Sequence, residues 1–173
     1  NINSSLSEVS WGTLAPQLYQ EGIPVIKDIN ETTASISVEY QITSQNSDGD
    51  TELYDVKEFY RMRYLDTRIY LLDFQRSANQ VFDGQLPVYS DDGIILGVRD
   101  KNVEYMMNDS ATVLAFVQEG DLWSYSPGNG KVNQVFSFRK TEDGDFRDSR
   151  IQHDIKIVRV TDAGDIDFVL YGY

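Results

Sequence analysis

The stretch from 111 to 138 constrains the fold more than any other part of the chain. It has the pattern of three short strands joined by two turns, ATVLAFVQ, EGD, LWSYS, PGNG and KVNQVFSF. In the first of these strands, both the odd and the even positions are apolar. A strand with this composition is covered on both faces. The stretch therefore predicts an antiparallel meander whose first strand is fully buried.

A second strand is predicted over residues 33–45, TASISVEYQITSQ. Ile36, Val38, Tyr40 and Ile42 alternate there with polar side chains. Strict alternation over this length is typical of a strand with one face on the core and one face in water. The segment 23–29, which follows Gly22, has the pattern of a shorter strand.

The longest predicted strand spans residues 51–65, and the link 66–67 joins it to a strand over 68–76. This arrangement predicts a hairpin with a tight turn. Aromatic and β-branched residues favour a strand over a helix here. One face carries Tyr54, Val56, Tyr60, Met62 and Tyr64, and the other mostly carries Asp55, Lys57, Arg61 and Arg63.

Helix is expected only in short pieces. In the first 22 residues, Trp11, Leu14, Leu18 and Tyr19 fit one face of a short helix, which Pro16 limits in length. The alternative is a loop whose Trp11 fills the edge of the core. A single helical turn is also considered over 77–82.

The C-terminal half supplies the remaining predicted strands. These lie over 94–100 and 102–108, with a hairpin formed by 153–160 and 165–173. Turns rich in Asp and Gly are predicted between strands at 47–50, 90–93, 142–145 and 162–165. Asp favours Asx turns there, and Gly adopts the positive φ angles that turns require. Strands at such intervals predict an all-β or mainly β fold of antiparallel meander sheets. A boundary near 90 divides it into 1–90 and 91–173.

The net charge of −13 over 173 residues argues against two kinds of partner. A field of this sign repels phosphate backbones and anionic lipid headgroups. The absence of cysteine excludes disulfides, thiolate metal sites and cysteine nucleophiles. Together with the many Ser, Thr, Asn and Tyr residues, it favours an extracytoplasmic, secreted or cell-surface location.

The two ends of the sequence suggest a piece of a longer protein. The chain starts at Asn1 without a methionine and stops within the apolar pattern DIDFVLYGY, residues 165–173. It contains no signal peptide and no transmembrane run, so no direct membrane insertion is expected of this segment.

The segment 112–138 resembles one blade of a β-propeller of the TolB or dipeptidyl-peptidase kind. Asp121, Leu122, Trp123 and Tyr125 match the D-L-W-x-Y strand of such blades, and a glycine-containing turn follows at 127–130. Residues 155–173 resemble the first half of a second blade. A propeller needs four to eight blades, and this chain has room for about two, so the resemblance implies a fragment or another β architecture.

The N-terminal half departs from the blade pattern. With its segment FYRMRYLDTRIYLLDFQR, residues 59–76, it resembles the extracytoplasmic YycH/YycI regulators of a bacterial histidine kinase. That family also uses long, curved antiparallel strands. The resemblance implies a sheet that contacts a membrane kinase.

Two kinds of ligand site are considered. Trp123 and Tyr125 could form a platform that stacks on a sugar, although aromatic residues on strands are more often core residues. Asp48 and Asp50 in one loop, with Asp143 and Asp145 in another, could bind Ca²⁺ weakly. Neither loop matches the EF-hand spacing, so solvated turns are the simpler interpretation, and no cofactor is expected.

A catalytic site is not indicated. His153 is the only histidine, and the adjacent Asp154 points to the opposite face of a strand, where it cannot orient the imidazole. There is no G-x-S-x-G elbow. A carboxylate pair for glycoside hydrolysis remains an alternative, because only a distance in space defines such a pair.

These observations favour a non-catalytic binding or scaffolding module of a larger bacterial protein, with a protein or carbohydrate partner. The alternatives are a regulator that contacts a membrane sensor kinase and a non-catalytic fragment of a hydrolase. A binding module predicts an exposed aromatic groove or an unpaired edge strand. A regulator predicts an apolar surface patch, and a hydrolase predicts clustered acids or His153 in a cleft.

Overall fold

The computed structural model describes residues 5–86, 88–90, 93–99, 101–139 and 153–172. The chain divides into two compact units, 1–80 and 81–173. The regular secondary structure of the described part is almost entirely β-strand in antiparallel sheets, which confirms the predicted fold class, and these strands form no closed barrel or propeller.

The first unit is built on one twisted antiparallel sheet. Its strands are ordered β1-β3-β4-β5, and β2 also pairs with β3. β4 and β5 form the predicted hairpin around Asp66 and Thr67, and Asp66 adopts φ = 54° in this tight link. The elements of this unit are α1 (Leu6–Val9), β1 (Gln17–Gln20), β2 (Val25–Ile29), β3 (Thr33–Gln45), β4 (Thr51–Leu65) and β5 (Arg68–Gln80).

The register of this sheet gives it an apolar face and a polar face. Directly paired residues on antiparallel strands point to the same side. The pairs Ile42–Tyr54 and Tyr60–Phe74 therefore lie on the apolar face, and Arg61–Asp73 lies on the polar face. The two faces predicted for residues 51–65 are confirmed.

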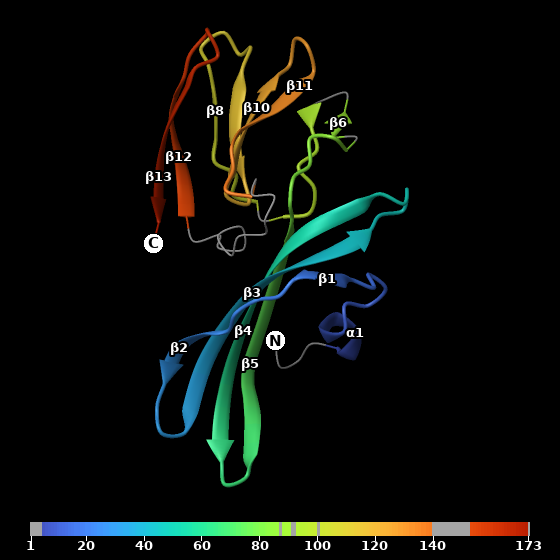
Figure 1. Ribbon diagram of the computed structural model, residues 1–173, viewed down its shortest axis with the longest axis vertical. Helices are drawn as coiled ribbons and strands as arrows, with labels where there is room; N and C mark the ends of the chain where they lie inside the picture. The colour runs from blue at the N-terminus through green and yellow to red at the C-terminus, as the bar shows by residue number, and fades with distance from the viewer. Residues whose placement is uncertain (1–4, 87, 91–92, 100, 140–152, 173) are drawn as a thin grey trace. The chain divides into compact units, whose positions relative to one another are not determined.

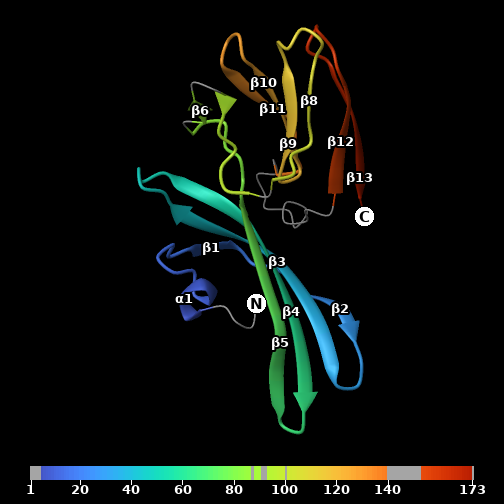
Figure 2. The same ribbon diagram turned by 180° about the vertical axis from the view of Figure 1, so that it is seen from behind.

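The N-terminal segment covers only one half of the apolar face. Ile42, Tyr54 and Val56 are buried there with Trp11 packed against them, and Ser44 Oγ donates to the carbonyl oxygen of Leu14 at 2.8 Å. Figures 1 and 2 show α1 beside the middle of the sheet, with β2 and the β4–β5 hairpin continuing past it.

The connection between β1 and β2 approaches β3 closely at Gly22. A Cβ atom added to Gly22 would lie 2.2 Å from the carbonyl oxygen of Glu39. Only glycine fits there, so this residue allows β1 and β2 to follow the same edge of β3.

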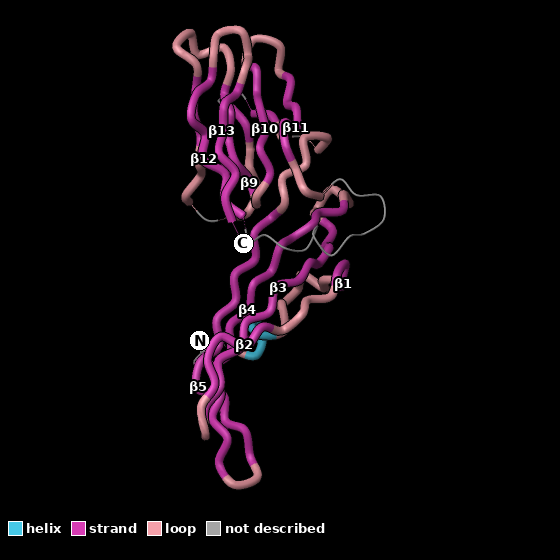
Figure 3. The backbone as a smooth tube through the Cα atoms, turned by 60° about the vertical axis from the view of Figure 1, so that its left-hand side comes forward, coloured by secondary structure: helices cyan, strands magenta, loops and turns pink. Residues whose placement is uncertain are grey.

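The second unit centres on a four-stranded sheet with the order β11-β10-β9-β8, whose strands are labelled in Figure 2. Figure 3 shows three of them, β9, β10 and β11, as a tube together with β12 and β13. β9 separates two apolar clusters: Ala115 packs with Ile155 and Ile157, and Phe116 packs with Phe82 and Trp123. The predicted two-sided burial of this strand is confirmed. The elements are β6 (Tyr89–Ser90), β7 (Gly93–Ile94), β8 (Tyr105–Met107), β9 (Leu114–Gln118), β10 (Asp121–Ser126), β11 (Lys131–Phe136), β12 (His153–Val160) and β13 (Ile166–Gly172).

Three local expectations are corrected. Residues 77–80 continue β5, because hydrogen bonding to β4 outweighs the helical turn considered for 77–82. The N-terminal helix is a single turn, and Leu18 and Tyr19 belong to β1. The strand expected over 94–100 is reduced to its first residue, in β7.

The two units meet in sequence at Gln80 and Val81, whereas the sequence suggested a boundary near 90. Phe82 and Val88 pack with Phe116 and Trp123. These contacts attach the segment after β5 to the second unit.

Candidate functional site

Trp123 and Tyr125, the predicted aromatic platform, lie next to each other on the same side of β10. Trp123 is 9% exposed, and its ring packs edge-on against Phe82 with centroids 5.0 Å apart. Tyr125 is half-buried, 6.3 Å from the ring of Tyr89. These contacts are typical of packing between sheets, and the sugar site remains a prediction.

The predicted acidic site at 48–50 is a hairpin turn organised by Asn46. Asn46 Oδ1 accepts hydrogen bonds from the backbone N–H groups of Asp48 (3.0 Å) and Asp50 (2.9 Å). Among the described residues, no three His, Asp or Glu side chains converge as metal ligands would. Asp143 and Asp145 lie outside the described residues.

His153, at the start of β12, is engaged by a backbone group. Its Nε2 donates to the carbonyl oxygen of Gly120 at 2.7 Å, and its ring packs edge-on against Phe138. This N–H is used to join β12 to the turn before β10.

A buried carboxylate that sequence reasoning missed lies at the middle of the first unit's sheet. Glu58 is 4% exposed and accepts hydrogen bonds from the hydroxyls of Tyr40 and Tyr60. Arg76 Nε lies 2.5 Å from Glu58 Oε1, and its guanidinium stacks 4.2 Å from the Trp11 ring centroid. The sequence signal was a glutamate at position 58 among the apolar positions 54, 56 and 60 of the same face, whereas its pairing with Arg76 required the register of β4 and β5.

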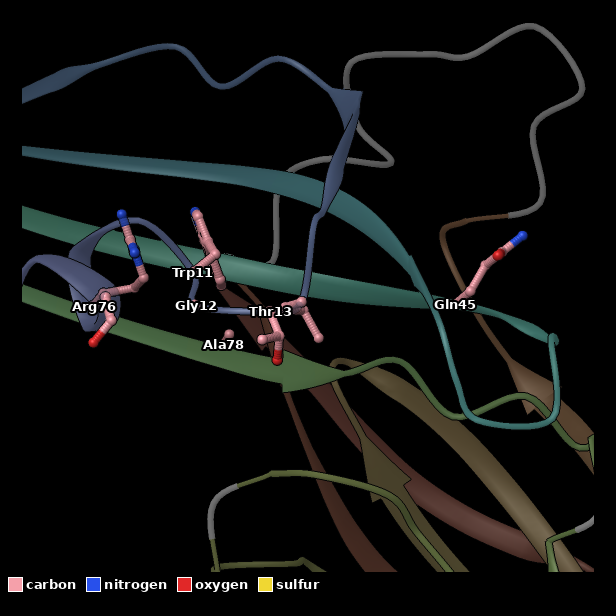
Figure 4. A pocket seen from close by; sticks show the side chains of 8 residues that line it. Trp11, Gly12, Thr13, Gln45, Arg76 and Ala78 are labelled. Atoms are coloured by element: carbon pink, nitrogen blue, oxygen red, sulfur yellow. The ribbon is translucent and has the colours of Figure 1, made fainter.

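Arg76 also borders a pocket of about 710 Å³ under the N-terminal segment, shown in Figure 4. The charge of Arg76 is neutralised by Glu58, and its Nη1 donates to the carbonyl oxygen of Val9 at 2.9 Å. Among the residues that the structure describes, no other ionisable side chain lines the pocket, so the described lining suits an uncharged group better than an anion. Its lining residues are Ser7, Trp11, Gly12, Thr13, Leu14, Gln45, Arg76 and Ala78.

The most distinctive surface of the first unit is the half of the apolar face that the N-terminal segment does not cover. We call it the distal apolar face. It carries nine apolar or tyrosine side chains from four neighbouring strands and no charged group. Its members are Ile26, Ile29, Ala34, Ile36, Tyr60, Met62, Tyr64, Ile69 and Leu71.

Several of these side chains are largely exposed. Ile69 is 70% exposed, Ile29 67%, Ile26 60% and Tyr64 55%. Isolated apolar residues on a surface are ordinary, whereas a contiguous apolar patch marks an interaction site. The alternation of apolar and polar residues along the strands predicted which side chains share this face. Only the structure shows that these side chains are exposed.

The edges of the same sheet are less suited to a partner strand. β5 has an unmatched residue, Leu72, opposite Arg61 and Met62 of β4, and β2 has an unmatched Lys27. Bulges and a lysine on a short strand are devices that discourage strand addition at an edge. The outer edge of β5 is otherwise unpaired among the described strands.

No family model, curated protein or solved structure matches this chain. Within the described residues, no helix has the length and apolar run that a membrane span requires.

Proposed function

We propose that this chain is a non-catalytic binding or scaffolding module that works outside the cytoplasm. The observation that supports the proposal most directly is the distal apolar face. It has four exposed side chains, each more than half accessible, on strands whose other side is mostly polar. In antiparallel sheets such alternation marks the apolar side as the one to be covered.

Protein is a better partner for this face than carbohydrate. Sugar sites combine aromatic platforms with several polar groups, whereas this face offers isoleucine, leucine and methionine with two tyrosines. Burial of such side chains contributes about 25 cal/mol per Å² of apolar area. The blade resemblance of the second unit is consistent with a scaffolding role, because β8 to β11 form a four-stranded antiparallel meander.

A regulator that contacts a membrane sensor kinase is the second candidate. An apolar surface patch is the feature that such a regulator needs, and the distal apolar face supplies one. The two candidates use the same surface and differ only in the identity of the partner.

Site-specific photocrosslinking tests the proposal. The photoreactive residue p-benzoylphenylalanine replaces Tyr64 on the distal apolar face or Tyr70 on the polar face of the same hairpin, two tyrosines that are 55% and 47% exposed. In the cells that naturally make the chain, position 64 should give a discrete crosslinked species that position 70 does not. If position 64 gives no such species, the proposal is wrong. Identification of a kinase in the crosslinked species would favour the regulator.

A further inference from the structure

We propose that the polar face of the β4–β5 hairpin binds an extended acidic segment of a partner protein through three arginines. Arg61 and Arg63 lie on β4 and Arg68 lies on β5, and the strand register places all three on this face. We call them the arginine cluster. The cluster lies on the opposite side of the strands from the distal apolar face, so this inference goes beyond the proposed function and does not depend on it.

The arginine cluster has no counter-charge in the part of the chain that the structure describes. All three side chains are exposed, and none of them forms an ion pair with a described residue. Asp73 pairs with Arg61 in the register, but its Oδ2 accepts a hydrogen bond from Gln75 Nε2 at 2.9 Å. Other basic side chains of the chain do form ion pairs, namely Lys57, Arg76, Arg139, Lys156 and Arg159.

The local charge of the hairpin is opposite in sign to that of the chain. Residues 59–71 hold three arginines and one aspartate, whereas the whole chain has a net charge of −13. Neighbouring like charges on one face of a sheet repel each other, so they do not stabilise the sheet. A ligand of negative charge would remove this repulsion, which gives the cluster a role that folding does not supply.

The centre of the site lies between Arg63 and Arg68. Two aspartates share the polar face, and both lie in the cross-strand row of Arg61: Asp73 on β5, and Asp28 on β2 beyond Ser35. The described rows that contain Arg63 and Arg68 have no acidic residue. An anion therefore meets the most positive field beside these two arginines.

Arginine is suited to carboxylates. Its planar guanidinium donates two parallel hydrogen bonds to one carboxylate, a geometry that lysine cannot provide. Arg63 pairs with Tyr70, and Arg68 lies two residues before Tyr70 on β5, so the two arginines are diagonal neighbours. Positions in this relation are about 7–8 Å apart. Both long side chains can therefore reach a single carboxylate.

The spacing of the cluster matches an extended peptide. Arg61 and Arg63 are two residues apart on β4, which separates them by about 6.6 Å along the strand. Alternate side chains of an extended peptide have the same separation. A segment with acidic residues at alternate positions, laid along β4, therefore matches one carboxylate to Arg63 and Arg68 and the next to Arg61.

A short acidic segment fits this site better than a large polyanion. Nucleic acids and anionic membranes extend over many ångströms and would meet the repulsive field of the whole chain. A peptide of a few residues meets mainly the local field, because charges beyond about 10 Å are screened at 0.1 M salt.

Fluorescence anisotropy of the full chain with two labelled peptides tests the proposal. One peptide has alternating acids, Asp-Thr-Asp-Thr-Asp, and the other has the same composition with adjacent acids, Asp-Asp-Asp-Thr-Thr. The alternating peptide should bind at least about 3-fold more tightly, because only its carboxylates match the spacing of the arginines. Its affinity should fall at least about 10-fold between about 20 and about 300 mM salt, because exposed charge pairs are screened.

Variants of the chain locate the binding site. Arg63→Gln should raise the dissociation constant of the alternating peptide at least about 5-fold. The matched control Arg159→Gln removes the same charge from an exposed arginine of the second unit and should change it less than about 2-fold. Arg63→Lys should give an intermediate value, because it keeps the charge and loses the two parallel hydrogen bonds. Circular dichroism shows whether each variant folds, and Arg68→Gln replaces Arg63→Gln if that variant does not fold.

Several outcomes would overturn the proposal. These are the absence of peptide binding to the unaltered chain, equal affinities for the two peptides, and equal effects of Arg63→Gln and Arg159→Gln. Tighter binding to phosphatidylglycerol vesicles than to the alternating peptide would assign the cluster to a phosphate ligand instead.

The photocrosslinking experiment distinguishes this site from the distal apolar face. Position 64 reports on the distal apolar face, so the absence of a crosslinked species there would refute the proposed function and leave the arginine cluster unaffected. A partner bound at the arginine cluster would be captured from position 70, beside Arg63, as a separate species.

Discussion

Glu58 and Arg76 face each other across β4 and β5, with Arg76 Nε 2.5 Å from Glu58 Oε1. The two side chains are 5% and 17% exposed. The pair lies where the covered half of the apolar face meets the distal apolar face. A buried ion pair therefore separates the covered half of the apolar face from the distal apolar face.

Loss of Arg76 should be strongly destabilising. Arg76→Met leaves the Glu58 carboxylate buried without a counter-charge, which lowers the free energy of unfolding by about 3–5 kcal/mol. The double variant Glu58→Leu/Arg76→Met removes both charges and should be more stable than Arg76→Met alone. Urea unfolding at pH 7 measures both variants, and a loss below about 1 kcal/mol for Arg76→Met would contradict the structural role.

The free energy of unfolding should fall at alkaline pH, because folding raises the pKa of three tyrosines, of which Tyr54 is buried and Tyr40 and Tyr60 are half-buried. Burial and the hydrogen bond to Glu58 raise the pKa of Tyr60 to about 12. Burial and the hydrogen bond to Glu52 raise the pKa of Tyr54 to about 12. Burial and the negative charge of Glu58 also raise the pKa of Tyr40 well above its usual value.

The unfolded chain loses tyrosine protons near pH 10. Above that pH it binds fewer protons than the folded chain, so the free energy of unfolding declines from about pH 10 to about pH 12. Tyr60→Phe should make this decline shallower in urea unfolding experiments at several pH values. An unchanged slope would show that Tyr60 does not contribute to it.

Trp123 should tolerate phenylalanine better than alanine. The ring is 9% exposed, and its Nε1 has no hydrogen-bond partner within the described part of the chain. Trp123→Phe therefore loses part of the ring's packing contacts and no hydrogen bond, and it should lower the free energy of unfolding by about 1–2 kcal/mol. Trp123→Ala should lower it by about 3–5 kcal/mol. Thermal unfolding measures the stability of both variants. Equal losses of stability for Trp123→Phe and Trp123→Ala would contradict the packing role of the aromatic ring.

A methyl group at Gly22 should be more damaging than the same change at an open glycine. Gly22→Ala forces the new Cβ against the Glu39 carbonyl oxygen, and it should lower the free energy of unfolding by about 1–3 kcal/mol. Gly128→Ala is the matched control, because no atom lies within 4 Å of its added Cβ. A similar stability for the two variants would contradict the close approach of the 21–24 segment to β3.

Much of the fold could be predicted from periodicity. Alternation along 33–45 and 51–65 predicted β3 and β4, and the two-residue link at 66–67 predicted the hairpin of β4 and β5. The two-sided apolar pattern of 111–118 predicted that β9 would be buried on both faces. These features are local, because side-chain period and turn length are set by neighbouring residues.

The candidate site depended on contacts that no local pattern contains. Alternation places Tyr60, Tyr64 and Val56 on one face, and it does not distinguish Val56 under the N-terminal segment from the exposed Tyr64. The Glu58–Arg76 pair likewise needed the register of β4 and β5. The sequence determined which side of each strand is apolar, because the period of a strand is a local property. Only the tertiary structure decided how much of that side is covered, because coverage depends on where a segment distant in sequence packs.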